Sequence, residues 1–287
     1  MNTAALSSPF HIRSMLAHEL DMGIAWAAQE GWNPGLHDRD SFYAADPEGF
    51  LLAEWDGEPV GMISAVRYGS SFGFIGFYIV RPAFRGRGHG LALWQAGMAR
   101  LAGRLVGLDG VVAQQANYCK SGFVLAYNNV RMQGVAHVKG AAHPDVVALD
   151  AVGIDPLLRY DALLFPAGRE AFLRRWVRQT GSTALGLVRA GYLKGYGVVR
   201  PCQVGYKVGP LFADDALVAH DLLNALMHHV PRGEPVQLDM VANHTAAREL
   251  AHTWQMAPVF ETARMYTGAA PELDLSRQFG ITSFELG

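Results

Sequence analysis

Apolar positions along the first half of the chain follow two different periods. Short runs with the spacing of β-strands come before residue 80, and Asp56-Gly57 between two of them indicates a hairpin, because glycine tolerates a positive φ. After residue 88 the period becomes 3.6, with Leu91, Trp94 and Met98 on one face of a helix. The expected elements are strands at 11–13, 50–55, 60–68, 72–80, 110–113 and 123–132, and helices at 18–29, 40–45, 88–103 and 115–121.

The second half repeats this order weakly after a broken stretch of small residues. Gly134, Gly140 and Pro144 interrupt the pattern there, so we divide the chain into domains at 1–136 and 137–287. The expected elements are helices at 169–180, 214–230 and 245–254, and strands at 183–189, 192–200, 203–212, 236–240 and 259–266. The fold class is therefore mixed α/β, with two diverged copies of one unit, each a mostly antiparallel sheet flanked by helices.

Length, composition and charge narrow the class of protein further. A chain of 287 residues suits two domains, and 50% hydrophobic with 17% charged residues is typical of a folded chain. A net charge of −2 favours neither nucleic acid nor an anionic membrane as partner. Residues 1–10 lack a leader pattern, and Cys119 and Cys202 suit a reducing compartment. We expect a cytoplasmic protein, and its oligomeric state is not indicated.

A glycine-rich loop with arginines connects a predicted strand to the long helix. It reads Val80-Arg81-Pro82-Ala83-Phe84-Arg85-Gly86-Arg87-Gly88-His89-Gly90-Leu91. Bare backbone N–H groups and the helix N-terminus suit a pyrophosphate. The spacing matches neither the dinucleotide fingerprint nor the Walker loop. Since the bare string recurs by chance in about one in four chains of this composition, its specificity depends on the flanking strand and helix. The alternatives are a plain glycine turn and an RNA-binding segment.

In this context the chain resembles the Gcn5-related N-acetyltransferase (GNAT) superfamily. Arg85, Gly88 and Gly90 match its acyl-CoA loop, Gln/Arg-x-x-Gly-x-Gly/Ala after a strand that ends in Val-x-Pro. A second family motif, Tyr-x-Lys-x-Gly-Phe, stands here as Tyr118-Cys119-Lys120-Ser121-Gly122-Phe123. The resemblance covers residues 12–131 and implies acetyl-CoA as cosubstrate. The whole chain looks like the tandem type, with a degenerate second half.

The resemblance implies roles for particular residues. The backbone of Tyr78, Ile79 and Val80 would pair with the pantetheine arm, and the loop would hold the pyrophosphate. Tyr118 would protonate the departing thiolate, because a phenol with a pKa of about 10 can serve a thiol with a pKa of about 8.5. The alternative for Tyr118 is a packing role. The implied cofactor-binding residues are Tyr78, Ile79, Val80, Arg85, Gly86, Arg87, Gly88, His89, Gly90 and Leu91.

Several positions depart from the family pattern or leave a role open. The family's asparagine seven residues before the tyrosine is Val111 here, with Gln114 or Asn117 as the candidate replacement. Glu30 and Trp32 fall where the family has its acceptor-side loop, so they are candidate substrate residues, although Glu30 also suits a solvated helix end. No general base is evident.

For the other potentially reactive side chains, a cysteine and three histidines, we predict structural rather than chemical roles. We expect Cys119 to be a structural thiol, because no His/Asp pair can be assigned to it. His228, His229 and His244 are expected at helix ends, because no cysteine or carboxylate array lies near them in the sequence. We therefore expect no metal.

The second half lacks the glycine-rich arginine loop. Asp214 and Asp215 stand at the N-terminus of its helix instead, where they suit helix caps and would repel a phosphate. One acyl-CoA site per chain is expected. The second half is then a candidate wall of the acceptor pocket, with Arg200, Tyr206 and Lys207 either contacting the acceptor or lying on the surface as ordinary residues.

Together these features predict an enzyme that transfers the acetyl group of acetyl-CoA directly to a primary amine. The acceptor is a small molecule or a peptidyl amine that the sequence does not identify. One alternative is a non-catalytic acyl-CoA-binding or regulatory protein. RNA binding through Arg85 and Arg87 is a second alternative, which the modest net charge disfavours.

Overall fold

A computed structural model describes residues 9–287 of the chain. The expectation about a leader in residues 1–10 therefore lies almost wholly outside the described residues. The first half contains the strands β1 (Phe10–Ser14), β2 (Phe50–Trp55), β3 (Glu58–Tyr68), β4 (Phe72–Val80), β5 (Leu105–Val111) and β6 (Val124–Val135). Its α-helices are α1 (Leu20–Gln29), α2 (Asp38–Ala45), α3 (His89–Arg100) and α4 (Gln115–Lys120).

The second half repeats this succession of elements. Its strands are β7 (Val146–Ala148), β8 (Thr183–Arg189), β9 (Tyr192–Pro201), β10 (Tyr206–Ala213), β11 (Pro235–Val241), β12 (Ala257–Tyr266) and β13 (Gln278–Gly280). Its α-helices are α5 (Leu149–Val152), α6 (Ile154–Asp161), α7 (Glu170–Trp176), α8 (Ala216–Met227) and α9 (Thr245–Thr253). The expected mixed α/β class is confirmed.

Most expected elements are present, with some differences. The strand expected at 110–113 runs from Leu105 to Val111, and β7, α5, α6 and β13 were not predicted. Gly153, at φ 82°, separates α5 from α6. It interrupts the helical spacing of apolar residues from which these helices could have been predicted. Leu217 was expected to face inward from its helix, but its side chain is 72% exposed.

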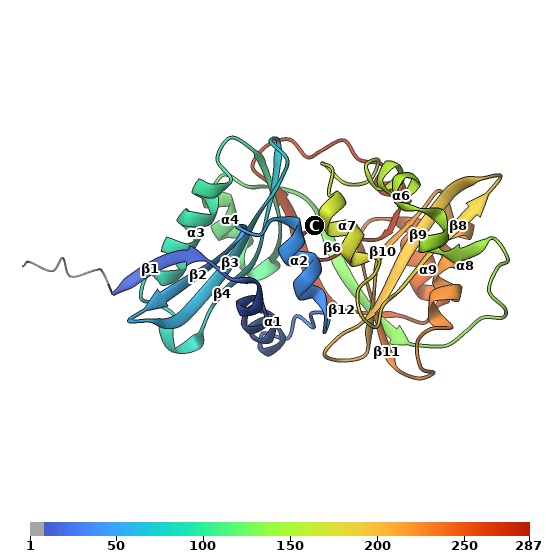
Figure 1. Cartoon of the computed structure of the whole chain (residues 1–287), viewed down its shortest axis with the longest axis horizontal. Coiled ribbons are helices and arrows are strands. Elements are labelled where there is room, and N and C mark those ends of the chain that lie inside the picture. The colour runs from blue at the N-terminus through green and yellow to red at the C-terminus, as the bar shows by residue number, and fades with distance from the viewer. Residues whose placement is uncertain (1–8) are drawn as a thin grey trace, which may run out of the picture.

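Strands from the two halves alternate at the middle of one continuous sheet. The order is β1-β2-β3-β4-β5-β12-β6-β11-β10-β9-β8-β7 over the described residues, with β13 paired to β10. Strand β12 lies between β5 and β6, and β6 in turn pairs with β11. Figure 1 shows β6 and β12 crossing the middle of the molecule side by side. Each half therefore completes its sheet with a strand from the other half.

Helices cover both faces of the sheet, and the two halves pack against each other. Alternation along β3 sends Ile63 and Ala65 into the core beneath α3, and Met62 and Val66 into the core beneath α1 and α2. Helix α2 lies beside α7 from the second half (Figure 1), where the rings of Phe42 and Trp176 stack with centroids 5.9 Å apart. This shared core fixes the relative placement of the halves.

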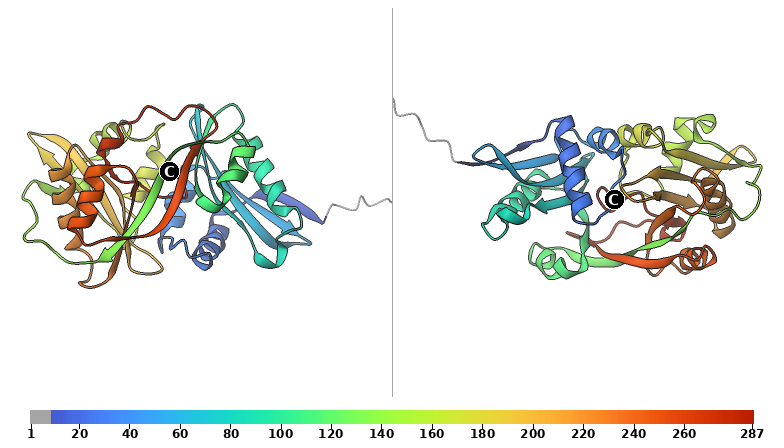
Figure 2. Two further views of the ribbon diagram at one scale, coloured as in Figure 1. Left: turned by 180° about the vertical axis from the view of Figure 1, so that it is seen from behind. Right: turned by 90° about the horizontal axis from the view of Figure 1, so that it is seen from below.

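The C-terminal segment is buried between the halves. Every residue from Gln278 to Gly287 is buried, and both views in Figure 2 place the C-terminus at the centre of the molecule. Strand β13 pairs with β10, and the Ile281 N–H donates to the Asp239 carbonyl at 2.8 Å. The chain then continues toward the first half, which brings its last residues to the site described below.

Candidate active site

The site begins where β4 and β5 separate. These strands pair in parallel only between Phe72–Ile75 and Leu105–Leu108, and beyond Ile75 they diverge. Phe77, at φ 44°, lies opposite a shift in the register of β4 with β3. The divergence opens a cavity of about 700 Å³ and leaves the β5-facing backbone edge of β4 without a strand partner there. An extended ligand can pair with such an edge.

Residues from both halves of the chain line this cavity. Among the residues chosen from sequence, those that line it are Glu30, Trp32, Tyr78, Ile79, Val80, Arg85, Leu91 and Tyr118. Five others chosen from sequence do not line it: Gly86, Arg87 and Gly88 in the loop, and His89 and Gly90 at the start of α3. One cavity therefore contains the strand segment expected to pair with pantetheine, Tyr78–Val80, the expected proton donor, Tyr118, and the two candidate acceptor-side residues.

The glycine loop turns sharply into α3. Gly86 and Gly88 have φ of 76° and 86°, a left-handed conformation that favours glycine. The first N–H groups of α3 have no intrahelical acceptor and point out of its N-terminus, where an anion is favoured. The His89 ring is buried against Phe10 and Trp55, with centroids 4.9 and 5.4 Å away. Only the backbone of His89 is therefore available to a phosphate.

Arg85 lies at the mouth of the cavity and joins the loop to α1. Its Nε donates to the Val80 carbonyl at 2.8 Å, and a terminal nitrogen pairs with the Glu30 carboxylate. Glu30 follows the last residue of α1, so it is both a helix end, as one interpretation of the sequence had it, and a residue of the cavity wall. Half of the Arg85 side chain remains exposed, so its guanidinium group can bind an anion at the mouth of the cavity.

Tyr118 lies on the opposite wall, on α4. Its ring packs against Trp94, with centroids 5.6 Å apart, and against the backbone of Gly110. Burial, together with the neighbouring Tyr78, raises the pKa of Tyr118 to about 12. The hydroxyl therefore keeps its proton at neutral pH and can donate it. The adjacent Cys119 is exposed and does not line the cavity.

Two amides stand near the position where the family pattern has an asparagine. Gln114 and Asn117 both line the cavity, and the Asn117 amide donates to Gln114 Oε1 at 2.7 Å. Lys120 donates to Asn117 Oδ1 at 3.3 Å. Either amide can turn toward a ligand in the cleft, since both side chains are exposed.

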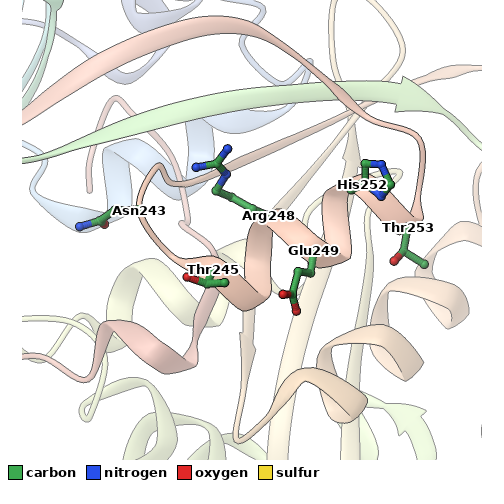
Figure 3. A pocket seen from close by; sticks show the side chains of 6 residues that line it. All are labelled: Asn243, Thr245, Arg248, Glu249, His252 and Thr253. Atoms are coloured by element: carbon green, nitrogen blue, oxygen red, sulfur yellow. The ribbon is translucent and has the colours of Figure 1, made fainter.

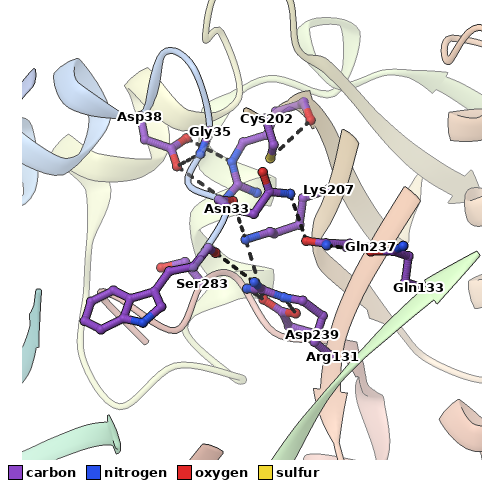
Figure 4. A network of polar contacts seen from close by, with 12 residues as sticks. Asn33, Gly35, Asp38, Arg131, Gln133, Cys202, Lys207, Gln237, Asp239 and Ser283 are labelled. Atoms are coloured by element: carbon purple, nitrogen blue, oxygen red, sulfur yellow. Dashed lines mark hydrogen bonds and ion pairs between the residues drawn. The ribbon is translucent and has the colours of Figure 1, made fainter. Parts of the chain in front are cut away.

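The inner end of the cavity is aromatic and is built largely from distant parts of the chain. Trp32, Phe260 and Phe284 line it, with Arg131 between them. Arg131 is buried and donates to both oxygens of Asp239, at 2.6 and 2.8 Å, and to the Trp32 carbonyl at 2.7 Å (Figure 4). Sequence reasoning missed Arg131, Phe260, Thr262, Phe284, Glu285 and Asp109 as wall residues, since none belongs to a motif.

Arg200, Tyr206 and Lys207 were the candidate contacts from the second half. Arg200 and Lys207 are buried, so the prediction that they are ordinary surface residues is wrong. The Arg200 guanidinium pairs with Asp38 at 2.9 Å and has no exposed surface. Lys207 donates to the Asn33 carbonyl at 3.0 Å (Figure 4), and burial, followed by the charge of Arg131, lowers its pKa. Tyr206 is partly buried against the second core. None of the three lines the cavity; Arg200 and Lys207 tie the halves together beside it.

The corresponding cleft of the second half is filled by the chain itself. Strands β10 and β11 pair only between Tyr206–Val208 and Val236–Leu238, and β13 then pairs with β10 at Leu211 and Phe212. At the start of α8 the Asp215 carboxylate accepts from the Val218 N–H at 2.9 Å, so the expected cap is confirmed. Asp214 pairs with Arg277. A second ligand cleft is thus closed.

A shallow polar hollow lies elsewhere, along α9. Figure 3 shows its six lining side chains on that one helix and the turn before it: Asn243, Thr245, Arg248, Glu249, His252 and Thr253. His244 caps this helix and His228 follows the last residue of α8, so both lie at helix ends as expected. Within residues 9–287 no three His, Cys, Asp or Glu side chains are grouped to hold a metal ion. No helix in the same range is long and apolar enough to span a bilayer.

Comparisons with known proteins agree with this geometry. A model described as acetyltransferase (GNAT) family matches residues 18–123, and one described as acetyltransferase (GNAT) domain matches residues 157–280. A holothin acyltransferase of Pseudoalteromonas sp. (strain SANK 73390) is 32% identical over 262 residues, or 91% of this chain and 89% of that one.

Solved structures show the same fold across the whole chain. A Pyrococcus horikoshii protein described as an acetyltransferase superposes with a TM-score of 0.82 at 23% identity, covering 100% of this chain and 99% of its own. A tandem GNAT protein from the clavulanic acid biosynthesis pathway superposes with a TM-score of 0.62 at 13% identity, covering 91% of this chain and 100% of its own. With an open cleft in the first half and a filled one in the second, this chain belongs to the GNAT superfamily of acyltransferases, in its tandem form.

Proposed function

We propose that this chain transfers the acetyl group of acetyl-CoA directly to a primary amine of a small molecule. The supporting observation is that one continuous cavity joins the open edge of β4, the Tyr118 hydroxyl and an aromatic inner end. Direct transfer needs both substrates in one space, with a proton donor beside the leaving group. The cavity offers that arrangement.

The residues of the outer cleft suit the parts of acetyl-CoA. The free edge of β4 at Tyr78–Val80 offers backbone groups to the pantetheine amides, and Gln114 or Asn117 can bond to them from α4. The N-terminus of α3 and Arg85 offer donors to the pyrophosphate. When bound, acetyl-CoA supplies an activated acetyl group as a thioester.

The chain's own residues would then manage the protons. Tyr118 keeps its proton at neutral pH and can pass it to the departing sulfur as the bond to the acetyl carbon breaks. Because its pKa is raised by burial, Tyr118 is a poor acid in isolation, so this donation would accompany bond breaking rather than precede it. Apolar side chains on the cavity wall, among them Trp94 and Phe77, would limit the access of water to the acetyl carbon.

The shape of the inner end supports a small acceptor. Phe260 comes from the second half and Phe284 from the buried C-terminal segment, and together with Trp32 they wall this end of the cavity. The relative named holothin acyltransferase has, by its name, holothin as its acceptor, and we propose an acceptor of comparable kind for this chain. A peptidyl amine on a folded protein is the less suitable acceptor for such a space.

The test is release of thiol from acetyl-CoA over a library of primary amines, followed by mass analysis of the acetylated product. We expect turnover that depends on the amine. Gly88→Trp should abolish it, because a bulky side chain at this left-handed position would distort the loop and block the binding of the pyrophosphate. Butyryl-CoA and hexanoyl-CoA should be run beside acetyl-CoA to define the acyl group. CoA binding by calorimetry without turnover of any amine would instead support the non-catalytic acyl-CoA-binding alternative.

A further inference from the structure

Three carboxylates line the cavity, and two of them are committed to partners. Glu30 pairs with Arg85 at the mouth. Asp109, on β5, accepts from Arg264 through both oxygens and from the Asn129 amide at 2.7 Å. A carboxylate that already accepts hydrogen bonds from an arginine and an amide has few lone pairs left for a substrate.

Glu285, the third carboxylate, is buried without a partner. Its residue is 4% exposed, and no group among residues 9–287 forms a hydrogen bond with its Oε2 atom or an ion pair with its carboxylate. Burying a carboxylate that accepts no hydrogen bond is costly, so such a group in a native fold calls for a functional explanation. Glu285 lines the same cavity as Tyr118.

The backbone around Glu285 is placed by a close contact with β4. A Cβ atom on Gly76 would lie 2.0 Å from the Glu285 carbonyl oxygen, so only glycine lets the C-terminal segment lie against the strand there. Gly76 follows Ile75, the last residue of β4 that pairs with β5. Glu285 is therefore held where the cleft opens, between the strand edge and the aromatic inner end.

Several buried charged groups lie near Glu285. Three buried cationic side chains lie beside the inner end of the cavity: Arg131, Lys207 and Arg200. Asp239 forms ion pairs with Arg131 and Lys207, and Asp38 forms one with Arg200. Glu285 is close enough to act electrostatically on all three cations. Because Oε2 of Glu285 accepts no hydrogen bond, its lone pairs are free to bind a donor from the acceptor.

We propose that Glu285 binds the amino group of the acceptor and takes its proton during transfer. This inference rests on the proposed function. The acceptor binds as an ammonium ion and first loses one proton to water, which leaves a neutral amine. The neutral nitrogen then forms the new bond to the acetyl carbon and gives a second proton to the Glu285 carboxylate. The bond from that carbon to sulfur breaks, and the sulfur receives a proton from Tyr118. Loss of the proton from Glu285 to solvent and reprotonation of Tyr118 restore both groups. The class of ligand recognised is an amine with an apolar, ring-bearing body.

A binding experiment tests this assignment without turnover. Benzylamine is the cationic probe and benzyl alcohol its neutral isostere, each titrated calorimetrically into the full-length protein saturated with CoA. We expect the wild type to bind benzylamine at least about 10-fold more tightly than benzyl alcohol, since a buried charge-assisted hydrogen bond contributes more than a neutral one. Glu285→Gln should abolish that preference and leave the affinity for benzyl alcohol and for CoA unchanged.

Turnover provides the second measurement. With the best amine of the library, Glu285→Gln should lower kcat by about 10²-fold or more, as removal of a general base does, and formate should partly restore Glu285→Ala. Glu54→Gln, which removes a buried carboxylate paired with Arg13 outside the cavity, is the matched control. The assignment is overturned if the wild type shows no preference for benzylamine, or if Glu285→Gln keeps that preference. A wild type that prefers benzylamine but acetylates no amine would instead refute the proposed function alone.

Discussion

The ring of Tyr118 lies directly against the backbone of Gly110. A Cβ atom on Gly110 would stand 2.1 Å from Cε2 of Tyr118, well inside any allowed contact. The glycine in β5 therefore makes the space that the aromatic ring occupies, and the ring in turn points into the cleft from α4. Position 110 controls the placement of Tyr118 although it offers no side chain of its own.

Gly110→Ala should consequently displace Tyr118. We expect kcat for amine acetylation to fall about 10-fold or more, because a misplaced proton donor loses much of its effect. Gly168→Ala is the control, since an added methyl group there meets nothing within 4 Å. Steady-state kinetics of both variants, with melting temperatures to confirm folding, are the measurement. Equal kcat in the two variants would show that the contact with Gly110 does not place Tyr118.

Tyr118→Phe removes the hydroxyl and keeps the ring. We expect kcat to fall about 10²-fold with little change in KM for acetyl-CoA, since proton donation matters only in the transition state. Because the pKa of Tyr118 is raised to about 12, its proton is present at neutral pH and is lost only as the pH rises through that value. Ionisation of Tyr118 should therefore not reduce wild-type kcat between pH 8 and 10. Tyr43→Phe, in α2, is the control for loss of a phenol outside the cavity.

Arg85→Ala tests the loop independently of the chemistry. Arg85 lies at the mouth of the cavity, so it should contribute to binding equally before and during transfer. We expect KM for acetyl-CoA to rise about 10-fold with kcat nearly unchanged, which is the signature of uniform binding. The wild-type KM should also rise with salt, and that dependence should weaken in the variant. Arg174→Ala, at an exposed position of α7, should change neither quantity.

The sequence predicts the local elements well wherever clear turn residues bound an apolar run. Strands β2, β4 and β8 match the expected ranges, because Asp-Gly, Gly-Ser or Ala-Gly pairs lie at one of their ends. Strand β5 was misplaced because Gly107 and Gly110 lie inside it. Those glycines serve packing instead, since Gly110 admits Tyr118 and a Cβ on Gly107 would lie 3.0 Å from Tyr266. Here tertiary contacts outweigh propensity.

The motifs located the cofactor side of the site but not its acceptor side. Tyr118 and the loop lie in one continuous segment, whereas the inner end joins Trp32, Phe260 and Phe284 across more than half of the chain. That juxtaposition arises because β12 inserts between β5 and β6 and the C-terminal segment returns to the cleft. Pairing between strands distant in sequence leaves no periodic signal. The burial of Arg200 was likewise hidden, because its partner Asp38 lies in the other half.

Breaking the ion pair between Asp38 and Arg200 should destabilise the joint between the halves. Both side chains have no exposed surface, and Asp38 also accepts from the Gln179 amide at 3.1 Å and the Gly35 N–H at 2.8 Å. Asp38→Ala leaves the Arg200 charge buried without a counterion, which costs about 3 to 5 kcal/mol. Urea denaturation measures the loss. Asp40→Ala, on the exposed side of the same helix, should change stability by less than about 0.5 kcal/mol.

The C-terminal segment connects the filled cleft of the second half to the open cleft of the first. In the second half a Cβ on Gly209 would lie 2.5 Å from the Thr282 carbonyl oxygen, just before Phe284 and Glu285 reach the cavity. Gly209→Ala should therefore displace the segment and lower kcat/KM for the amine about 10-fold, although Gly209 does not line the cavity. The affinity for CoA, measured by calorimetry, should not change, because the contact between Gly209 and Thr282 lies outside the cofactor cleft. Gly168→Ala again serves as control, and a weakened affinity for CoA in Gly209→Ala would mean that the substitution disturbs the fold as a whole rather than the acceptor end alone.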